Sequence, residues 1–137
     1  MLVIQKAGAS FPLQLSLIQM KTVKINSYAK VNLGLKILNE RSDGYHNIST
    51  IFQEIDLYDE LTISKNISGC QFNSNVNWLH NDKNNLCVIA YNHMKELYDI
   101  EGVDIMLTKN ISKGSGLGSG SSNAAAVLKS INKVYDL

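Results

Sequence analysis

The clearest periodic signal in the chain is an alternation of apolar and polar residues that follows Met20. It runs through residues 22–38, where apolar side chains recur at nearly every second position, and this period of two predicts β structure. Residues 39–45 then gather polar residues and a glycine, which favour a turn. Further alternation predicts a strand over residues 48–55 and a short one over residues 61–64. The first half of the chain is therefore expected to be a run of consecutive strands.

Helical spacing replaces this alternation in the second half. A weak strand over residues 71–73 and an asparagine-rich loop over residues 73–85 come first. Asn84 and Asn85 can cap the helix that follows, because their side chains accept hydrogen bonds from unpaired backbone N–H groups. Residues three and four apart then form a stripe that we expect to face the core. The stripe comprises Leu86, Ile89, Ala90, His93, Met94 and Leu97.

A further strand and a last helix are expected beyond Gly102. Residues 103–107 predict the strand, and residues 114–120 form a glycine-rich loop that leads into the helix. The apolar face of this helix comprises Ala124, Val127, Leu128, Ile131 and Tyr135. Consecutive strands followed by irregularly alternating helices and strands favour an α+β fold over a doubly wound parallel sheet.

Composition narrows the function without choosing one. The 137 residues suit one domain, 45% of them are hydrophobic, and the net charge is only +1. This balance gives no reason to expect a nucleic acid or an anionic membrane as partner. Cys70 and Cys87 lie far apart with no CxxC spacing, which argues against a disulfide framework or a zinc site. We expect structural thiols in a reducing cytoplasm.

The first nineteen residues differ from the rest. Residues 1–19 contain no acidic residue and one lysine, and Pro12 and Gln14 interrupt their apolar stretches. A signal peptide needs a continuous apolar core, so export is not expected, and no apolar run in the chain approaches the length of a membrane span. We interpret residues 1–19 as a leader, either an artefact of an upstream start or a disordered extension. The domain is expected to cover residues 20–137.

The chemistry of the chain concentrates in the glycine- and serine-rich residues 114–122. Glycine lets the backbone turn and lets a ligand approach closely, and the start of a helix offers unpaired N–H groups and a positive dipole end. That combination binds phosphate. The hydroxyls of Ser119, Ser121 and Ser122 can bond phosphate oxygens or hold a magnesium ion. No acidic residue lies between Asp104 and Asp136, so an anion would meet no local repulsion.

The loop differs from two common phosphate-binding motifs. It lacks the Gly-Lys-Ser/Thr ending of a Walker A motif, and Ser121 stands where the dinucleotide fingerprint requires its last glycine. The structural alternative is a flexible glycine–serine linker. A linker does not normally lead straight into an amphipathic helix, and Leu117 at its centre is unusual for one. Phosphate binding is the favoured interpretation.

Residues 116–125, Gly-Leu-Gly-Ser-Gly-Ser-Ser-Asn-Ala-Ala, resemble the phosphate loop of the GHMP kinases. Two N-terminal segments, residues 29–33 and 41–46, resemble motifs of the branch of this family that phosphorylates a cytidyl-diphosphate alcohol. Thr50, Gln53 and the segments 56–61 and 84–86 fit the same branch. The resemblance covers residues 21–137, and its strength lies in the order and spacing of the motifs.

The resemblance implies the fold, the reaction and its cofactors. The fold would be the α+β, ribosomal protein S5 domain 2-like fold of the GHMP kinase N-terminal domain. The reaction would be ATP-dependent phosphorylation of the 2-hydroxyl of 4-diphosphocytidyl-2-C-methyl-D-erythritol, in the non-mevalonate isoprenoid pathway, with ATP and Mg²⁺ required. The alternatives are another GHMP small-molecule kinase and a non-catalytic nucleotide- or RNA-binding module of the same fold.

The resemblance also assigns residues to roles. Lys30 would be catalytic, steadying charge that develops at the reacting centre, while Asn32, Tyr45 and His46 would bind the substrate. Without the resemblance, these four are ordinary strand and turn residues. The ATP-binding residues would be Ser112, Lys113, Gly114, Ser115, Gly116, Leu117, Gly118, Ser119, Gly120, Ser121 and Ser122.

Two departures from the family pattern and one missing segment qualify the assignment. Ser112 stands where the family usually has a proline, and Ser119 where it often has a glycine. The catalytic aspartate of the family would lie downstream of the last helix. We therefore interpret the sequence as the N-terminal part of a kinase, with the C-terminal domain absent. Such a part is expected to bind nucleotide weakly and to turn over little by itself.

Overall fold

The structure, a computed structural model, describes residues 21–80, 82 and 84–137. The predicted leader, residues 1–19, lies outside the described residues. The elements in chain order are β1 (Thr22–Glu40), β2 (His46–Asn66), β3 (Gly69–Ser74), the short 3-10 helix η1 (Asn77–Leu79), α1 (Leu86–Tyr98), β4 (Gly102–Thr108) and α2 (Ser119–Tyr135). This order of strands and helices confirms the predicted α+β class.

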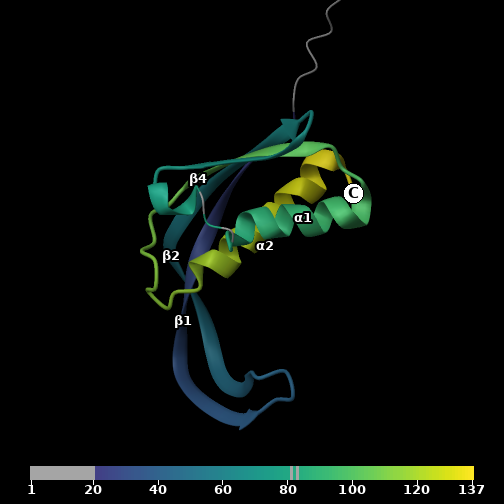
Figure 1. Cartoon of the computed structure of the whole chain (residues 1–137). Coiled ribbons are helices and arrows are strands. Elements are labelled where there is room, and N and C mark those ends of the chain that lie inside the picture. The colour runs from purple at the N-terminus through teal and green to yellow at the C-terminus, as the bar shows by residue number, and fades with distance from the viewer. Residues whose placement is uncertain (1–20, 81, 83) are drawn as a thin grey trace, which may run out of the picture.

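The four strands form one sheet in the order β1-β2-β4-β3. β1 pairs antiparallel with β2, β2 pairs antiparallel with β4, and β3 pairs parallel with β4. Both α-helices lie on the same side of the sheet, where they run alongside each other (Figure 1). The described residues include no helix of sufficient length and apolarity to cross a membrane.

The core fills the space between the sheet and the two helices. The sheet contributes alternate residues of β2 and β4, and the helices contribute one stripe each, as period-two and period-3.6 patterns require. In these elements, the fully or almost fully buried apolar residues are Leu61, Ile63, Val103, Ile105, Leu107, Tyr91, Val127, Ile131 and Val134. The predicted strand at β4 and the predicted buried positions Val127 and Ile131 of α2 are therefore confirmed.

The buried face of each helix differs in part from the predicted one. In α1 the buried residues are Cys87, Ala90, Tyr91 and Met94, whereas Leu86 and Leu97 are 43% and 74% exposed and His93 is exposed. The predicted stripe was wrong at these three positions because a second stripe with the same spacing was available. The large ring of Tyr91 decides between them, since its hydroxyl can donate to the Glu101 carbonyl at 3.1 Å while the ring stays buried. The cap was predicted correctly, because Asn85 accepts a hydrogen bond from the backbone N–H of Cys87.

In α2 the prediction failed at Leu128, which is 39% exposed. The buried face instead includes Ala126 and Val134, together with the polar residues Asn123 and Ser130. Because Asn123 and Ser130 are polar, the pattern of apolar residues alone did not identify the buried face of the helix correctly. The buried position of Asn123 is important for the site, because its side chain donates a hydrogen bond of 3.0 Å to Asp59 on β2.

A two-stranded ribbon made by β1 and β2 projects from the body of the molecule and curves beneath it (Figure 1). The sequence predicted two separate strands, 48–55 and 61–64, where β2 is continuous. Residues 56–57 form a bulge, since Tyr28 pairs with Tyr58 but the next residue of β1 pairs with Ile55. The bulge breaks the alternation without ending the strand.

A second irregularity lies within the ribbon at Gly34. The register shifts between Leu33 and Leu35, and Gly34 between them has a φ of 66°, a conformation that glycine adopts without steric cost. The ribbon ends in the predicted turn. There, the backbone N–H of Gly44 donates to the Arg41 carbonyl, and Arg41 forms an ion pair of 2.7 Å with Asp43.

Candidate functional site

The glycine-rich segment leaves β4, loops outward and enters α2 at Gly118. Gly114, Gly116 and Gly118 have φ values of 73°, 74° and 74°. Gly118 is the N-cap of α2, no side chain caps the helix there, and its first turn holds no acidic residue. The N–H groups of this turn therefore face outward without a side-chain acceptor, which is the condition for binding an anion.

The loop encloses a hollow of about 210 Å³ in front of this helix start. It is lined by Leu86, Ser112, Gly114, Ser115, Gly116, Gly118, Ser119, Gly120 and Ser121. A second pocket of about 210 Å³ adjoins it and shares Leu86, Gly114, Ser119 and Gly120 with it. The second pocket also has apolar walls, notably Trp78 and Leu107, and its rim carries Lys113, whose ammonium lies 4.6 Å from the centre of the Trp78 ring. The two hollows together form a polar compartment beside a partly aromatic one.

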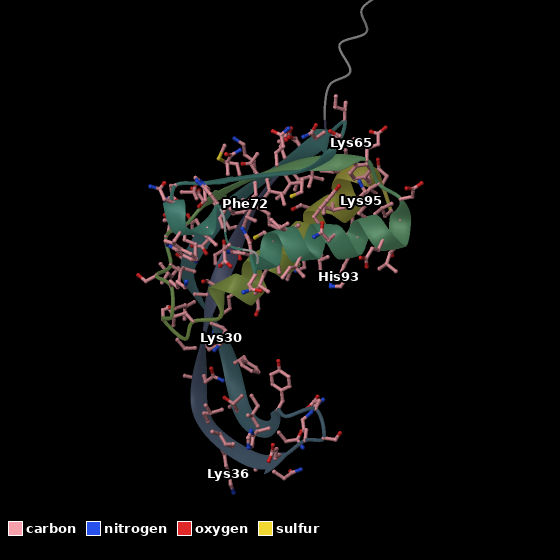
Figure 2. All side chains as sticks on the ribbon, viewed as in Figure 1. Lys30, Lys36, Lys65, Phe72, His93 and Lys95 are labelled. Atoms are coloured by element: carbon pink, nitrogen blue, oxygen red, sulfur yellow. The ribbon has the colours of Figure 1, made fainter. Side chains whose placement is uncertain are left out.

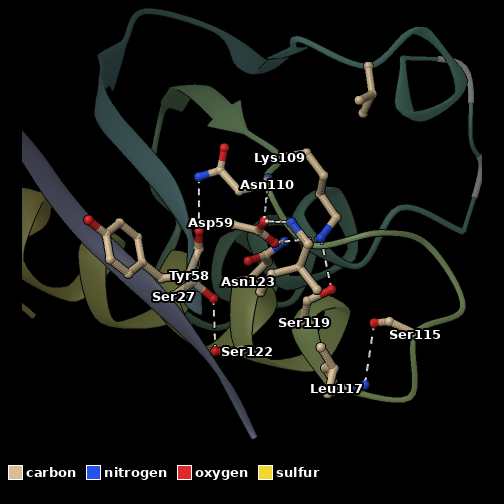
Figure 3. Close-up of polar contacts among 12 residues, drawn as sticks. Ser27, Tyr58, Asp59, Lys109, Asn110, Ser115, Leu117, Ser119, Ser122 and Asn123 are labelled. Atoms are coloured by element: carbon tan, nitrogen blue, oxygen red, sulfur yellow. Dashed lines mark hydrogen bonds and ion pairs between the residues drawn. The ribbon is translucent and has the colours of Figure 1, made fainter. Parts of the chain in front are cut away.

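A buried carboxylate lies beneath the loop (Figure 3). Asp59 is 0% exposed, and its Oδ1 accepts hydrogen bonds from the backbone N–H groups of Asn110 at 2.7 Å and Ile111 at 2.8 Å. Its Oδ2 accepts from Nζ of Lys109 at 2.5 Å and from Nδ2 of Asn123 at 3.0 Å. Lys109 also donates to the hydroxyl of Ser119 at 2.8 Å. One side chain of β2 thus contacts the segments on both sides of the loop.

The charge of this carboxylate is stable at neutral pH. Burial alone raises the pKa of Asp59, but the hydrogen bonds from Lys109, Ile111, Asn123 and Asn110 outweigh it and hold the pKa below its ordinary value of 3.8. The sequence prediction that an anion would meet no acidic group was therefore incomplete. Asp59 comes from a distant part of the chain, and it neutralises Lys109, whose side chain is only 7% exposed.

Two of the three predicted serine hydroxyls already have partners inside the protein. Ser119 accepts from Lys109, and Ser122 accepts a hydrogen bond of 2.8 Å from the hydroxyl of Ser27 on β1. Ser121 is exposed on the first turn of α2. Of the three hydroxyls, that of Ser121 is the most accessible to a ligand.

Lys30 connects the loop with the ribbon, at the point where the ribbon leaves the body (Figure 2). Its backbone N–H donates to the Leu117 carbonyl at 2.9 Å, and its ammonium donates to the Gly116 carbonyl at 3.0 Å. The same ammonium donates to Oδ1 of Asn32 at 2.7 Å, and Nδ2 of Asn32 donates to the hydroxyl of Thr50 at 3.1 Å. A continuous hydrogen-bonded chain therefore runs from the loop onto the ribbon.

Tyr45 and His46 lie at the far end of the ribbon. Tyr45 is 74% exposed, and His46 pairs with Glu40 at the close of the hairpin. The strand from Asn32 to Glu40, at about 3.3 Å per residue, corresponds to roughly 25 Å of chain. Lys30 and Asn32 are thus brought together with the loop, whereas Tyr45 and His46 are not in contact with that group.

A model of the GHMP kinases N terminal domain matches residues 85–137, which include the loop and α2. The 4-diphosphocytidyl-2-C-methyl-D-erythritol kinase of Clostridium beijerinckii is 46% identical over 116 residues, which are 84% of this chain and 41% of that protein. A crystal structure of 4-(cytidine 5'-diphospho)-2C-methyl-D-erythritol kinase superposes with a TM-score of 0.70 at 37% identity, covering 82% of this chain and 41% of that one. The chain carries the N-terminal domain of the GHMP kinases.

Other members share the GHMP kinase fold at lower identity. The Methanococcus jannaschii mevalonate kinase gives a TM-score of 0.60 at 21% identity, over 85% of this chain and 41% of that one, which shows the fold alone. The chain spans about two fifths of the length of the curated relatives that it matches. The predicted fold, the N-terminal domain of a GHMP kinase, is confirmed.

Sequence reasoning missed three residues of this candidate site. Asp59 and Thr50 were noticed only as parts of the family resemblance, and Phe52 was not noticed at all. Phe52 pairs with Asn32 across the ribbon, and its ring centre lies 5.8 Å from the Lys30 ammonium. Directly paired residues of antiparallel strands share a face, so a correct hairpin register would have found Phe52.

Proposed function

We propose that the protein transfers the γ-phosphoryl group of ATP to the 2-hydroxyl of 4-diphosphocytidyl-2-C-methyl-D-erythritol, with residues 20–137 as the ATP-binding domain. The names of the relatives support this acceptor. The observation that carries the proposal is the ammonium of Lys30, which contacts the loop through Gly116 and the ribbon through Asn32. A phosphoryl-transfer site needs such a junction, because donor and acceptor must meet in line.

ATP would bind across the two adjoining hollows. The triphosphate would occupy the hollow formed by residues 112–122, where the N–H groups of the first turn of α2 can donate to its oxygens. The nucleoside would occupy the neighbouring pocket, whose aromatic wall at Trp78 suits a flat base. Gly114 and Gly120 line both hollows, and because glycine has no side chain they leave room for a phosphate chain between them.

Mg²⁺ is the metal that we propose to accompany ATP. The described residues contain no group of three or more acidic, histidine or cysteine side chains able to hold a metal ion. The ion would therefore be bound mainly by the phosphates and by water, as Mg²⁺ commonly is beside nucleotides. Of the three serine hydroxyls at the start of α2, that of Ser121 is the most available to join it, since Ser119 and Ser122 are used inside the protein.

Lys30 would stabilise the charge of the transferring phosphoryl group. A lysine ammonium has three N–H donors, and two of them bond to Gly116 and Asn32. The third remains for a phosphoryl oxygen at the junction of loop and ribbon. Because the first two bonds fix the ammonium beforehand, little reorganisation is needed during transfer.

The acceptor would lie along the ribbon. Asn32 is close enough to Lys30 to help orient the reacting hydroxyl, while Tyr45 and His46 at the tip offer an aromatic ring and an imidazole to a cytosine base. We expect the reaction to occur in the cytoplasm, where ATP is available, and the partners to be small molecules.

The test uses the complete protein encoded by the gene that contains this sequence. ATP-dependent phosphorylation of the cytidyl alcohol is measured together with ATP affinity by calorimetry. Lys30→Ala is expected to reduce kcat by about 10²- to 10³-fold while ATP still binds. Wild-type protein that binds ATP but does not phosphorylate this alcohol would refute the acceptor assignment. Full activity in the Lys30→Ala variant would refute the assigned role of Lys30.

A further inference from the structure

The contacts of Asp59 differ from those of an ordinary buried ion pair. A simple pair would join two side chains, but Asp59 joins three segments of the chain. The backbone N–H groups of Asn110 and Ile111 approach it directly after β4, and Asn123 approaches it from the second turn of α2. Figure 3 shows these groups converging on the carboxylate from both sides.

The segments that Asp59 joins are the two ends of the glycine-rich loop. Residues 109–111 precede the loop, while Ser119 and Asn123 lie in α2, just after its N-cap Gly118. Ser119 is connected to the carboxylate through Lys109, which donates to both. The two ends of the loop are therefore bridged from beneath by one side chain of β2.

The body of the loop has few internal contacts that could set its shape instead. Gly114, Gly116 and Ser115 are exposed, and the two glycines have left-handed backbone conformations. Because glycine also adopts other conformations at little cost, these residues do not by themselves fix the shape of the loop. The backbone and ammonium of Lys30 hold the middle of the loop at Gly116 and Leu117. With its middle held by Lys30, the loop still needs fixed ends to direct its N–H groups toward one point.

We propose that Asp59 is a positioning residue for the nucleotide, one that fixes both ends of the phosphate loop so that its N–H groups converge on the polyphosphate. This inference rests on the proposed function, because it presumes that the loop binds ATP. Asp59 does not touch the ligand in this proposal. It acts through the backbone at residues 110–111 and through the side chains of Lys109 and Asn123.

The use of a charge here supports a geometric role over a purely stabilising one. Removing a carboxylate and an ammonium from water is unfavourable, and an apolar pair of similar volume often gives equal or greater stability. An apolar side chain could not accept the N–H groups of Asn110, Ile111 and Asn123, however, and these bonds are directional. The carboxylate is the side chain of this size with enough acceptor sites for all of its donors.

The decisive variant is Asp59→Asn in the complete protein. It keeps the shape, but its amide nitrogen replaces one acceptor oxygen, and Lys109 is left buried without a counter-charge. We expect the KM for ATP and the Kd for ATP to rise about tenfold or more, with the KM for the cytidyl alcohol within about twofold of wild type. Loss of stability alone would lower the active fraction and leave both KM values unchanged.

Val134→Ala provides a matched control for destabilisation. Val134 is fully buried near the far end of α2 and has no contact with the loop among the described interactions. This variant should lower the unfolding temperature and leave the KM for ATP unchanged. If Val134→Ala raised the KM for ATP as much as Asp59→Asn does, a general effect of stability would replace the proposed positioning role.

A milder variant keeps the inference testable if Asp59→Asn does not fold. Asn123→Ala removes one donor to Asp59 and leaves the other three bonds, so a rise of about two- to fivefold in the Kd for ATP is expected. If Asp59→Asn, or Asn123→Ala where only that variant folds, bound ATP with wild-type affinity, the inference would be overturned. Wild-type protein that does not bind ATP would instead overturn the proposed function, so the two failures are distinguishable.

Discussion

The body around the phosphate loop and the projecting ribbon are built from the same two strands, yet they are stabilised in opposite ways. In the body, β1 and β2 are covered by helices, and residues such as Leu61 and Ile63 are buried. In the ribbon, Leu35, Ile37 and Ile51 are 57%, 64% and 66% exposed. The difference indicates that the body carries the stability of the fold, whereas the ribbon contributes a surface.

The two regions also differ in how their polar groups are used. The polar groups under the loop are enclosed and mutually bonded around Asp59. Those of the ribbon tip, including the Arg41–Asp43 pair, are exposed to water, where an ion pair is worth little. The loop therefore needs a fixed geometry, and the ribbon needs only to present side chains.

Truncation of a core residue and of a ribbon residue should give the largest contrast. Ile131→Ala removes a 0%-exposed side chain and is expected to lower the free energy of unfolding by about 2–5 kcal/mol. Ile37→Ala removes a side chain that is 64% exposed and should change it by less than about 0.5 kcal/mol. Urea denaturation followed by circular dichroism measures both. Equal losses would contradict the assignment of stability to the body.

Substitution of two glycines tests the same contrast on function. Gly118→Ala meets both a φ of 74° and a Cβ position 3.0 Å from Cε of Lys30, so ATP affinity should fall about tenfold. Gly44 at the ribbon tip has a φ of 81° and nothing within 4 Å, so Gly44→Ala carries similar backbone strain. Calorimetry should find unchanged ATP affinity for Gly44→Ala. A fall in both variants would mean that strain anywhere in the sheet disturbs the loop.

Acid should affect the body more than the ribbon. The pKa of Asp59 lies below its ordinary value of 3.8, so its stabilising contribution is fully present above that pH and is lost as the pH falls through the lower, folded-state pKa. Asp59→Asn should flatten the dependence of unfolding free energy on pH below about pH 4. The Arg41 hydrogen bond also lowers the pKa of Asp43, but this group is exposed, so Asp43→Asn should leave the dependence nearly unchanged. The reverse ranking would contradict the comparison.

The smallest expected effect concerns the two free thiols of the body. Burial raises the pKa of Cys70 to about 11 and that of Cys87 to about 12, so neither is a thiolate at neutral pH. Both should react with a disulfide reagent at pH 8 far more slowly than a free cysteine, with Cys87 the slower because it is more buried. Rapid labelling of Cys87 would show that α1 opens readily from the sheet.

The sequence predicted features whose signal is local. The cap at Asn85, the turn at the ribbon tip and the buried positions Val127 and Ile131 follow from nearby residues, and so does the character of the loop. The predictions failed where distant residues decide. Asp59 receives its hydrogen bonds from residues fifty or more positions away along the chain, and only the family resemblance had drawn attention to its segment.

The continuity of β2 and the direction of α1 show the same limit. A bulge at residues 56–57 is visible only once β2 is paired with β1, and the sequence alone gives no register. The choice between two equally spaced stripes on α1 depends on what the helix packs against. The stripe that contains Tyr91 is the buried one, because the Tyr91 hydroxyl donates a hydrogen bond to a backbone carbonyl outside the helix.

The bond between the backbone N–H of Lys30 and the Leu117 carbonyl has a consequence for engineering. Because the peptide group makes this contact, one of the two bonds that hold the middle of the loop on β1 remains whichever amino acid occupies position 30, proline excepted. Position 30 can therefore be varied to alter the chemistry of the junction without detaching the loop. A non-natural amine or a shortened lysine analogue introduced there would sample different reach and basicity on an unchanged scaffold.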